Sequence, residues 1–147
     1  MQKTKLKTFL WFSGGLEEAL DFYTATFDDV VIHSKNRMGD QLFTADFSIF
    51  GHEFIGMNWA GGDKFNDSIS LSLNVDGQEE VDRIWAAITA EGREGQCGWC
   101  YDKWGLTWQV SPIQMRDWLG HPDAEVREYA NTALRGMTKI VIDELHV

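Results

Sequence analysis

The chain has 147 residues, enough for one domain or two tightly fused subdomains with a core that needs neither disulfides nor a metal. It carries 13 basic and 23 acidic residues, and a net charge of −10 argues against nucleic acid and anionic membranes as partners. Its two cysteines, Cys97 and Cys100, fit a reduced cytosolic protein.

The N-terminal residues 1–7 have the basic start of a signal sequence. The apolar stretch that follows, Phe9 to Phe12, is far shorter than a signal peptide requires. No apolar run elsewhere is long enough to span a bilayer. We therefore expect a cytoplasmic protein.

The first predicted elements are an apolar strand up to Phe12, a turn at Ser13-Gly14-Gly15 and an amphipathic helix. Glu17 and Glu18 place negative charge at the positive end of the helix dipole. An apolar stripe then follows at helical spacing and predicts that the helix lies on a sheet. Its members are Leu16, Ala19, Leu20, Tyr23 and Phe27.

This unit occurs twice. Residues 71–85 repeat residues 9–23 at a shift of 62 positions, with an apolar strand, a small polar turn, paired glutamates and a second amphipathic helix. At helix and strand spacing, Trp11, Trp85 and Trp108 are predicted to be core residues. A chain of two like halves is expected to place its ligand site where the halves meet.

The remaining pattern predicts two hairpins and two further helices. Residues 41–58 predict a pair of antiparallel strands turning at Gly51-His52, and residues 96–111 predict a second pair. A short helix is expected between Pro112 and Gly120. A longer one, capped by Asp123, follows and has no counterpart in the first half.

Strand, helix and antiparallel strands, made twice, resemble the vicinal oxygen chelate superfamily of glyoxalase, bleomycin-resistance and dioxygenase proteins, and within it the PhnB-like group, also labelled demethylubiquinone 3-methyltransferase-like. The resemblance covers nearly the whole chain, and its most specific part is the block from Gly95 to Val110. The matching residues are Phe12 to Ala19, Phe22-Tyr23, Phe65-Asn66, Glu79 to Asp82, Trp85, Gly95 to Trp99, Asp102-Lys103, Gly105 and Trp108 to Val110.

The resemblance implies an α+β fold in which paired βαβββ modules form a concave mixed sheet, with an added C-terminal helix. We expect a single domain over residues 1–147, with modules at about 6–60 and 68–112 and a helical extension at 113–147. A homodimer is expected from the resemblance and from the extra amphipathic helix.

In metal-dependent members of the superfamily, four ligands project from four strands. The matching positions here are Thr8, Gly56, Ser70 and Gln109, with about one residue of uncertainty at Gly56. Hydroxyls, an amide and a glycine are poor ligands for a divalent ion. We therefore expect no metal and no other cofactor.

Strand alternation predicts the residues that line the concave side. Ser70, Ser72 and Asn74 are expected there from one strand, and Thr107, Gln109 and Ser111 from another, with Thr8, Leu10 and Phe12 from the first copy. Neutral polar groups beside aromatic walls suit a small organic ligand. The candidate ligand-binding residues are Thr8, Phe12, Asn66, Ser70, Ser72, Cys97, Trp99 and Gln109.

The first functional hypothesis is thus a metal-free protein that binds a small organic molecule. An alternative is an enzyme acting on a small metabolite without a metal, as a glyoxalase-like lyase or isomerase or as a transferase, with acid-base help from Gln109, Ser70, Cys97 or Asp102. A third is an interaction protein whose concavity is filled by side chains. The sequence names no catalytic residue, ligand or reaction.

Two other chemistries are weakly supported. Cys97-Gly98-Trp99-Cys100 has redox spacing, but a hairpin follows it, so no helix start is available to lower a thiol pKa. A methyl-donor nucleotide would need a glycine-rich turn, and the nearest, Gly14-Gly15, belongs to the repeated unit.

Overall fold

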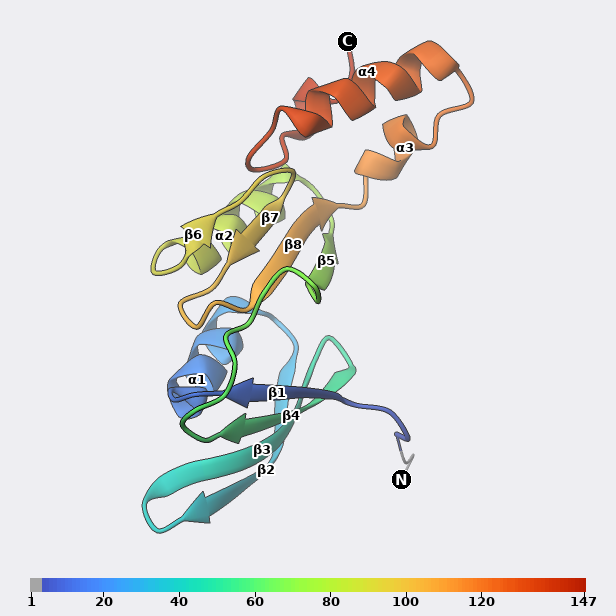
Figure 1. The fold of residues 1–147 in the computed structure, drawn as a ribbon. Helices are drawn as coiled ribbons and strands as arrows, with labels where there is room; N and C mark the ends of the chain where they lie inside the picture. The colour runs from blue at the N-terminus through green and yellow to red at the C-terminus, as the bar shows by residue number, and fades with distance from the viewer. Residues whose placement is uncertain (1–3) are drawn as a thin grey trace. The chain divides into compact units, whose positions relative to one another are not determined.

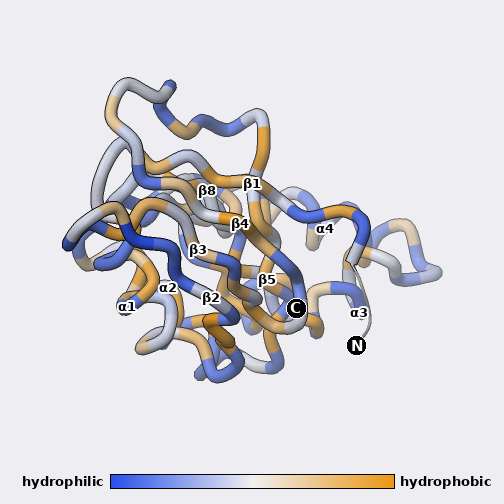
Figure 2. Tube along the Cα trace, turned by 90° about the horizontal axis from the view of Figure 1, so that it is seen from below, coloured by the Kyte–Doolittle hydropathy of each residue, from blue (hydrophilic) through white to orange (hydrophobic). Residues whose placement is uncertain are grey.

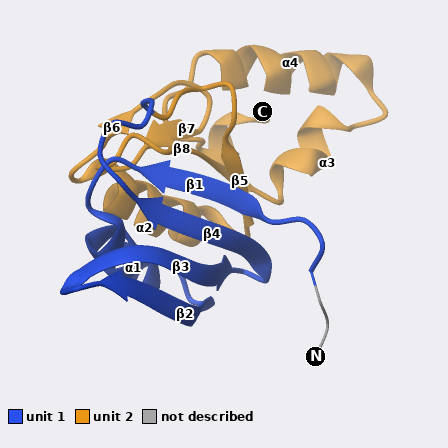
Figure 3. Cartoon of the chain, turned by 60° about the horizontal axis from the view of Figure 1, so that its bottom comes forward, with its two compact units in different colours: residues 1–64 blue, residues 65–147 orange. Residues whose placement is uncertain are grey.

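The computed structural model describes residues 4–147, so part of the basic N-terminal start, residues 1–3, lies outside the described residues. The chain divides into two compact units, residues 1–64 and residues 65–147 (Figure 3). Each unit contains a four-stranded mixed sheet, and the predicted α+β fold class is confirmed.

The first unit has five elements in the order strand, helix, three strands. They are β1 (Thr8–Phe12), α1 (Leu16–Thr26), β2 (Val30–Met38), β3 (Gln41–Ile49) and β4 (His52–Asn58). The sheet order is β1-β4-β3-β2, with β1 parallel to β4 and the other neighbours antiparallel.

The core of this unit lies between α1 and one face of the sheet. Leu16, Ala19, Leu20 and Tyr23 are buried, as the stripe predicts, and each of the two leucines contributes on the order of 1.5–3 kcal/mol. A Cβ at Gly56 of β4 would lie 2.7 Å from Leu16 Cδ1, so this position faces α1 at close approach.

The second unit repeats the arrangement. Its elements are β5 (Leu71–Val75), α2 (Gln78–Thr89), β6 (Arg93–Glu94), β7 (Trp99–Tyr101) and β8 (Thr107–Pro112). The sheet order is β5-β8-β7-β6, with β5 parallel to β8, and α2 covers one face of the sheet (Figure 1). Val81, Ile84, Trp85 and Ile88 of α2 are buried against it, as predicted.

The two copies do not match at one constant shift. The helices match at 62 positions, but β1 and β5 share the same burial pattern only at 63, because Leu10 and Phe12 are buried like Leu73 and Val75. The turn before α1 is therefore one residue longer than the turn at Asp76-Gly77. The expectation that Leu10 faces away from the helix is wrong, since Leu10 pairs with Gly56 on the α1 side.

The C-terminal extension belongs to the second unit. It consists of α3 (Met115–Leu119), α4 (Ala124–Arg135) and a short helical turn, Ile142–Glu144. Met137, Ile140 and Leu145 form a separate buried cluster, against which side chains of α3 and α4 pack. The extension thus has a small core of its own.

Contacts from α2 and from Gly98 tie the extension to the sheet layer. The Gln78 amide donates to the Ile140 carbonyl and accepts from the Ile142 N–H, at 2.9 and 2.7 Å. Lys139 Nζ lies 2.7 Å from Asp82 Oδ1. Gly98, at φ +84°, lies so close to Ile140 that a Cβ there would be 2.7 Å from its Cδ1.

Two features depart from the sequence analysis. The βαβββ module implied by the resemblance requires β2, but the residue pattern did not locate it, because its second half is polar and exposed and shows no apolar alternation (Figure 2). Trp11 is not a core residue: it is 39% exposed and its indole N–H donates to the Trp59 carbonyl, whereas Trp85 and Trp108 are buried as predicted. No helix within residues 4–147 is long and apolar enough to cross a membrane.

Candidate functional site

The face of the second sheet opposite α2 carries a row of polar and aromatic side chains across three strands. Ser72 of β5 pairs with Gln109 of β8, and Gln109 pairs with Trp99 of β7. Residues paired in this way lie side by side on one face of the sheet. Three predicted ligand-binding residues are therefore brought together.

Ser70 and Gln109 are joined directly, because the Gln109 Nε2 group donates to Ser70 Oγ at 2.9 Å. With its amide N–H engaged there, Gln109 retains its Oε1 as an acceptor for the open face. Both are positions that the resemblance matched to metal ligands, and here they hold an amide and a hydroxyl in contact.

Asn66 lies in the loop that closes one end of this face. Its Oδ1 accepts from the Ser68 N–H at 2.8 Å, and its carbonyl lies 3.2 Å from the Thr107 hydroxyl. Asp67 Oδ1 lies 3.4 Å from the same hydroxyl, which explains why Thr107 is fully buried although it points away from α2. Asn66 thus shapes the rim of the row.

Tyr101 extends the aromatic part of the face. Its hydrogen bond with Asp67, followed by burial, raises the pKa of the phenol above its ordinary value. The guanidinium of Arg93 lies 3.6 Å above the centre of the ring. The aromatic part of the face thus ends in a cation–π contact.

Thr8 and Phe12, the candidates from the first unit, lie on the α1 side of their sheet. Phe12 is 1% exposed and belongs to the core, and Thr8 shares a 2.9 Å hydrogen bond with His52 Nε2. This placement follows from the extra residue in the turn before α1. When the two helices are aligned, the residues of β1 that face the helix correspond to residues of β5 that face away from it. Within their unit neither lies on the open face.

Cys97 is turned toward the C-terminal extension. Its thiol donates to the Leu134 carbonyl at 3.3 Å and its N–H donates to the Met137 carbonyl at 2.8 Å. It has a positive φ of 57°, which reverses the chain just before β7. Cys97 therefore anchors α4 and does not join the row of Ser72, Gln109 and Trp99.

Cys100, the other member of the pair, is fully buried on the α2 side of the sheet. Burial, with a smaller contribution from nearby Asp102, raises the pKa of its thiol to about 12. Both cysteines are free thiols in the structure. A thiolate at Cys100 is therefore strongly disfavoured near neutral pH.

Asp102, weighed above as an acid-base group, has a structural environment. It is 3% exposed, and its Oδ1 accepts from the N–H groups of Trp104 and Leu106, each at 3.0 Å. Its Oδ2 accepts from the Trp108 indole N–H at 3.0 Å. Both oxygens are thus engaged in fixing the turn between β7 and β8.

The donor groups of the described residues do not favour a divalent metal ion. Residues 4–147 contain no group of three or more histidine, cysteine, aspartate or glutamate side chains arranged to hold a metal ion. The Ser70 and Gln109 side chains are neutral and already hydrogen-bonded to each other. The residues present do not fit the superfamily's metal centre.

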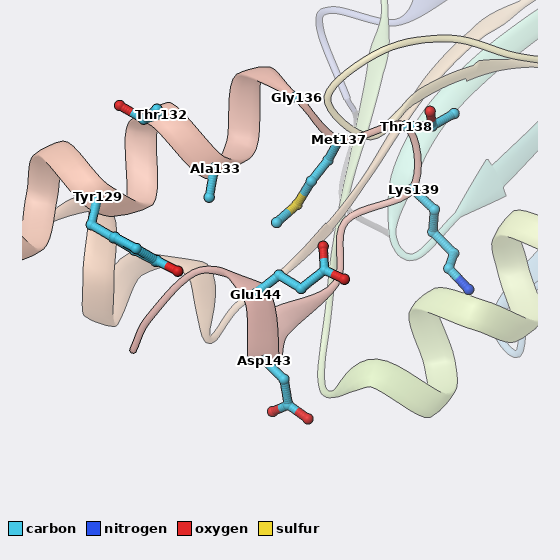
Figure 4. A pocket seen from close by; sticks show the side chains of 9 residues that line it. All are labelled: Tyr129, Thr132, Ala133, Gly136, Met137, Thr138, Lys139, Asp143 and Glu144. Carbon is cyan, nitrogen blue, oxygen red and sulfur yellow. The ribbon is translucent and has the colours of Figure 1, made fainter.

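The hollows on the surface of the described residues include one in the first unit and two beside α4. One of about 380 Å³ in the first unit includes Asn58, whose buried Oδ1 has no partner among the residues described. One of about 710 Å³ lies between α4 and the segment that follows it (Figure 4). The third, of about 500 Å³, lies at the start of α4.

On the open face of the first sheet the structure shows residues that the sequence analysis missed. Phe9 and Trp11 of β1 pair with Ile55 and Met57 of β4, and Lys7 Nζ lies 3.2 Å from Asp46 Oδ1. The signal that could have identified them was the turn length, since three residues separate Phe12 from Leu16 and two separate Val75 from Gln78. This face is more apolar than its counterpart.

The comparisons with known proteins agree on the fold. Residues 4–111 match the family profile described as 3-demethylubiquinone-9 3-methyltransferase. A solved structure of a PhnB protein from Bacillus cereus, described with the same methyltransferase name, is similar, with 28% identity and a TM-score of 0.66 over 74% of this chain and 99% of that one.

Two further solved structures show the same fold at lower identity. A Pseudomonas aeruginosa protein has 18% identity and a TM-score of 0.64 over 75% of this chain and 98% of its own. An Arabidopsis thaliana gene product has 15% identity and a TM-score of 0.52 over 73% and 97%. Among curated proteins no match is found.

Proposed function

The chain belongs to the PhnB-like family, described as 3-demethylubiquinone-9 3-methyltransferase, and from this premise we propose that it binds a small, neutral, partly apolar organic molecule without a metal. The proposed site is the open face of the second sheet. The row formed by Ser72, Gln109 and Trp99 carries this proposal.

The chemistry of the row supports a neutral ligand. Ser70, Ser72 and Gln109 offer hydroxyls and an amide, and Trp99 offers an apolar ring edge or face. Trp99 and Gln109 are half-buried and Ser72 is exposed, so the row is both walled and accessible. A few polar groups beside an aromatic wall suit recognition of a small organic molecule.

Binding is favoured over acid-base catalysis because two of the four weighed groups have other roles. Asp102 accepts three N–H donors and Cys97 donates to Leu134. Ser70 and Gln109 remain, and neither ionises near neutral pH. We do not propose the methyl transfer named in the family description. The Gly14-Gly15 turn is part of a repeated strand-turn-helix unit, with a shorter counterpart at Asp76-Gly77 before α2, and is therefore not a dedicated site for a methyl-donor nucleotide.

The proposal is tested with a library of neutral metabolites screened by thermal shift and by NMR of the Gln109 side-chain amide and the Trp99 indole. A ligand at 100 times its dissociation constant stabilises the native state by about 2.7 kcal/mol, which raises Tm by roughly 5–10 °C for a chain of this size.

Gln109→Ala should weaken binding of such a hit about tenfold, since it removes one half-buried hydrogen-bonding partner. Gln96→Ala, an exposed glutamine before β7, is the matched control and should leave binding unchanged. The proposed site would be wrong if the hits shift resonances elsewhere and bind the Gln109→Ala variant with unchanged affinity. Stoichiometric zinc, nickel, iron or manganese in the purified protein would overturn the metal-free part.

We also propose that the chain forms a homodimer. Large apolar side chains of the first unit, Phe9, Trp11 and Trp59, are between about two-fifths and half exposed, and a second copy could cover them. Sizing chromatography with light scattering should give twice the chain mass. A monomer at micromolar concentration would reject this proposal.

A further inference from the structure

The start of α4 encloses a hollow that the family resemblance does not explain. The family profile ends at residue 111, whereas every residue lining the hollow lies between 118 and 147. Its volume is about 500 Å³, within the range of small-molecule sites. The lining residues are Trp118, His121, Asp123, Glu125, Val126, Tyr129, His146 and Val147.

The hollow exists because the apolar stripe of α4 is covered over only part of its length. Ala133 and Leu134, near the end of the helix, pack against the cluster of Met137, Ile140 and Leu145. Val126 and Tyr129, nearer the start, face the hollow instead, and Tyr129 is 46% exposed. The helix therefore retains apolar surface that no side chain of the extension fills.

The walls are aromatic. Trp118 and Tyr129 line the hollow, and the imidazole ring of His146 stacks on Trp118 with the ring centres 4.5 Å apart and the planes 10° apart. Figure 4 shows Tyr129 projecting from α4 toward the segment that carries Glu144, in the adjoining hollow that shares this tyrosine. Electron-rich ring faces attract organic cations.

The charges that line the hollow have the matching sign. Asp123 and Glu125 are both exposed carboxylates, and no lysine or arginine is among the lining residues. The positive end of the α4 dipole amounts to about half an elementary charge, less than the two carboxylates together. Arg127 lies close by and keeps its positive charge, but it is not a lining residue, and its Nη1 donates to the carbonyls of His121 and Pro122.

We propose that this hollow binds a small organic cation of the alkylammonium class, held between the aromatic rings and the two carboxylates. A quaternary ammonium group suits it because such a group needs no directed hydrogen-bond acceptor and gains from contact with Trp118 and Tyr129. This site is separate from the neutral row on the second sheet.

The test titrates the full chain with choline and with its uncharged analogue 3,3-dimethylbutan-1-ol, which has the same shape. Binding is followed by NMR of the Trp118 indole N–H, assigned with Trp118→Phe. Choline should bind in the millimolar range and shift Trp118 and the residues around Tyr129. The neutral analogue should bind at least fivefold more weakly.

Glu125→Gln should weaken choline binding about threefold or more, because it removes a lining charge and keeps the shape of the side chain. Glu128→Gln is the matched control on the same helix, exposed and outside the hollow, and should have no comparable effect. Tyr129→Leu should also weaken binding. Circular dichroism checks that each variant is folded.

Four outcomes overturn the proposal. Three of them are equal affinity for choline and its neutral analogue, equal effects of Glu125→Gln and Glu128→Gln, and absence of Trp118 shifts at 100-fold molar excess, on the order of 10 mM choline. Choline shifts confined to Trp99 and Gln109 would assign the cation to the other site and overturn it as well.

Discussion

At the scale of single residues, Asp102 shows how burial and hydrogen bonding decide what a carboxylate does. A buried carboxylate with both oxygens occupied by N–H donors is a fixed part of a turn. From the sequence alone Asp102 was also a possible acid-base group, since the identity of a residue does not reveal which donors surround it.

We predict that Asp102→Ala destabilises the protein by roughly 2–4 kcal/mol, because it removes the carboxylate that accepts from two buried N–H groups and one part-buried N–H group. Asp102→Asn should cost less, since one amide oxygen can still accept from the backbone. Urea denaturation measures both. Glu91→Ala, an exposed carboxylate at the end of α2, serves as the control and should change stability little.

The buried Cys100 thiol carries a prediction about reactivity. With its pKa raised to about 12, it stays protonated between pH 7 and pH 9, and we expect it to resist a disulfide reagent at pH 8 in the native protein. Removing it with Cys100→Ala should leave the fast-reacting thiol count unchanged. Two thiols reacting at equal rates, or an internal disulfide after mild oxidation, would contradict this.

At the scale of elements, the helices and the buried strands were predictable from periodicity. The stripes of α1 and α2 fall where the 3.6-residue period places them, and the hairpin at Gly51-His52 forms as expected. β2 was not predictable in this way. It is an edge strand whose second half is exposed on both faces, so alternate residues there do not need to be apolar.

The candidate site was half predictable for a related reason. Alternation placed Ser70, Ser72 and Gln109 correctly on the open face of the second sheet. It misplaced Thr8 and Phe12, since a single extra residue in a turn reverses the faces of a strand. The direction of the Cys97 side chain depends on a positive φ. Because positive φ is uncommon for residues other than glycine, the sequence did not indicate it.

The anchoring of the C-terminal extension gives a prediction at this scale. Gln78→Ala removes the hydrogen bonds to Ile140 and Ile142, and we expect hydrogen exchange at the Ile142 amide to accelerate at least tenfold. Amides of α1, in the other unit, should be unaffected. An unchanged exchange rate at Ile142 would show that the Gln78 hydrogen bonds are not needed to hold the segment.

The Lys139–Asp82 ion pair makes the same anchor sensitive to acid. Hydrogen bonds from Lys139 and then Gln78 lower the pKa of Asp82 below its ordinary value. Its stabilisation is therefore complete above the ordinary carboxyl pKa and is lost as pH falls through the lowered one. In Asp82→Asn, exchange at Ile142 should lose this part of its pH dependence.

At the scale of the whole molecule, the two units are joined by an exposed stretch. Residues 59–70 contain no helix or strand, and Lys64 is exposed at the point where the units divide. We predict that limited trypsin digestion cuts first at Lys64, giving fragments 1–64 and 65–147 by mass spectrometry. Lys64→Gln should slow the first cleavage, while Lys103→Gln, in the β7–β8 turn, should not.

The extra residue in the turn before α1 also bears on protein engineering. Anyone grafting the polar row of the second unit into the first would align the helices and transplant residues 71–75 onto residues 9–13. Such a chimera would bring Ser72 and Asn74 to the positions of Leu10 and Phe12, inside the hydrophobic core. Residues 71–75 have to replace residues 8–12 instead. The two halves therefore correspond in structure, but no single sequence alignment without a gap matches both their strands and their helices.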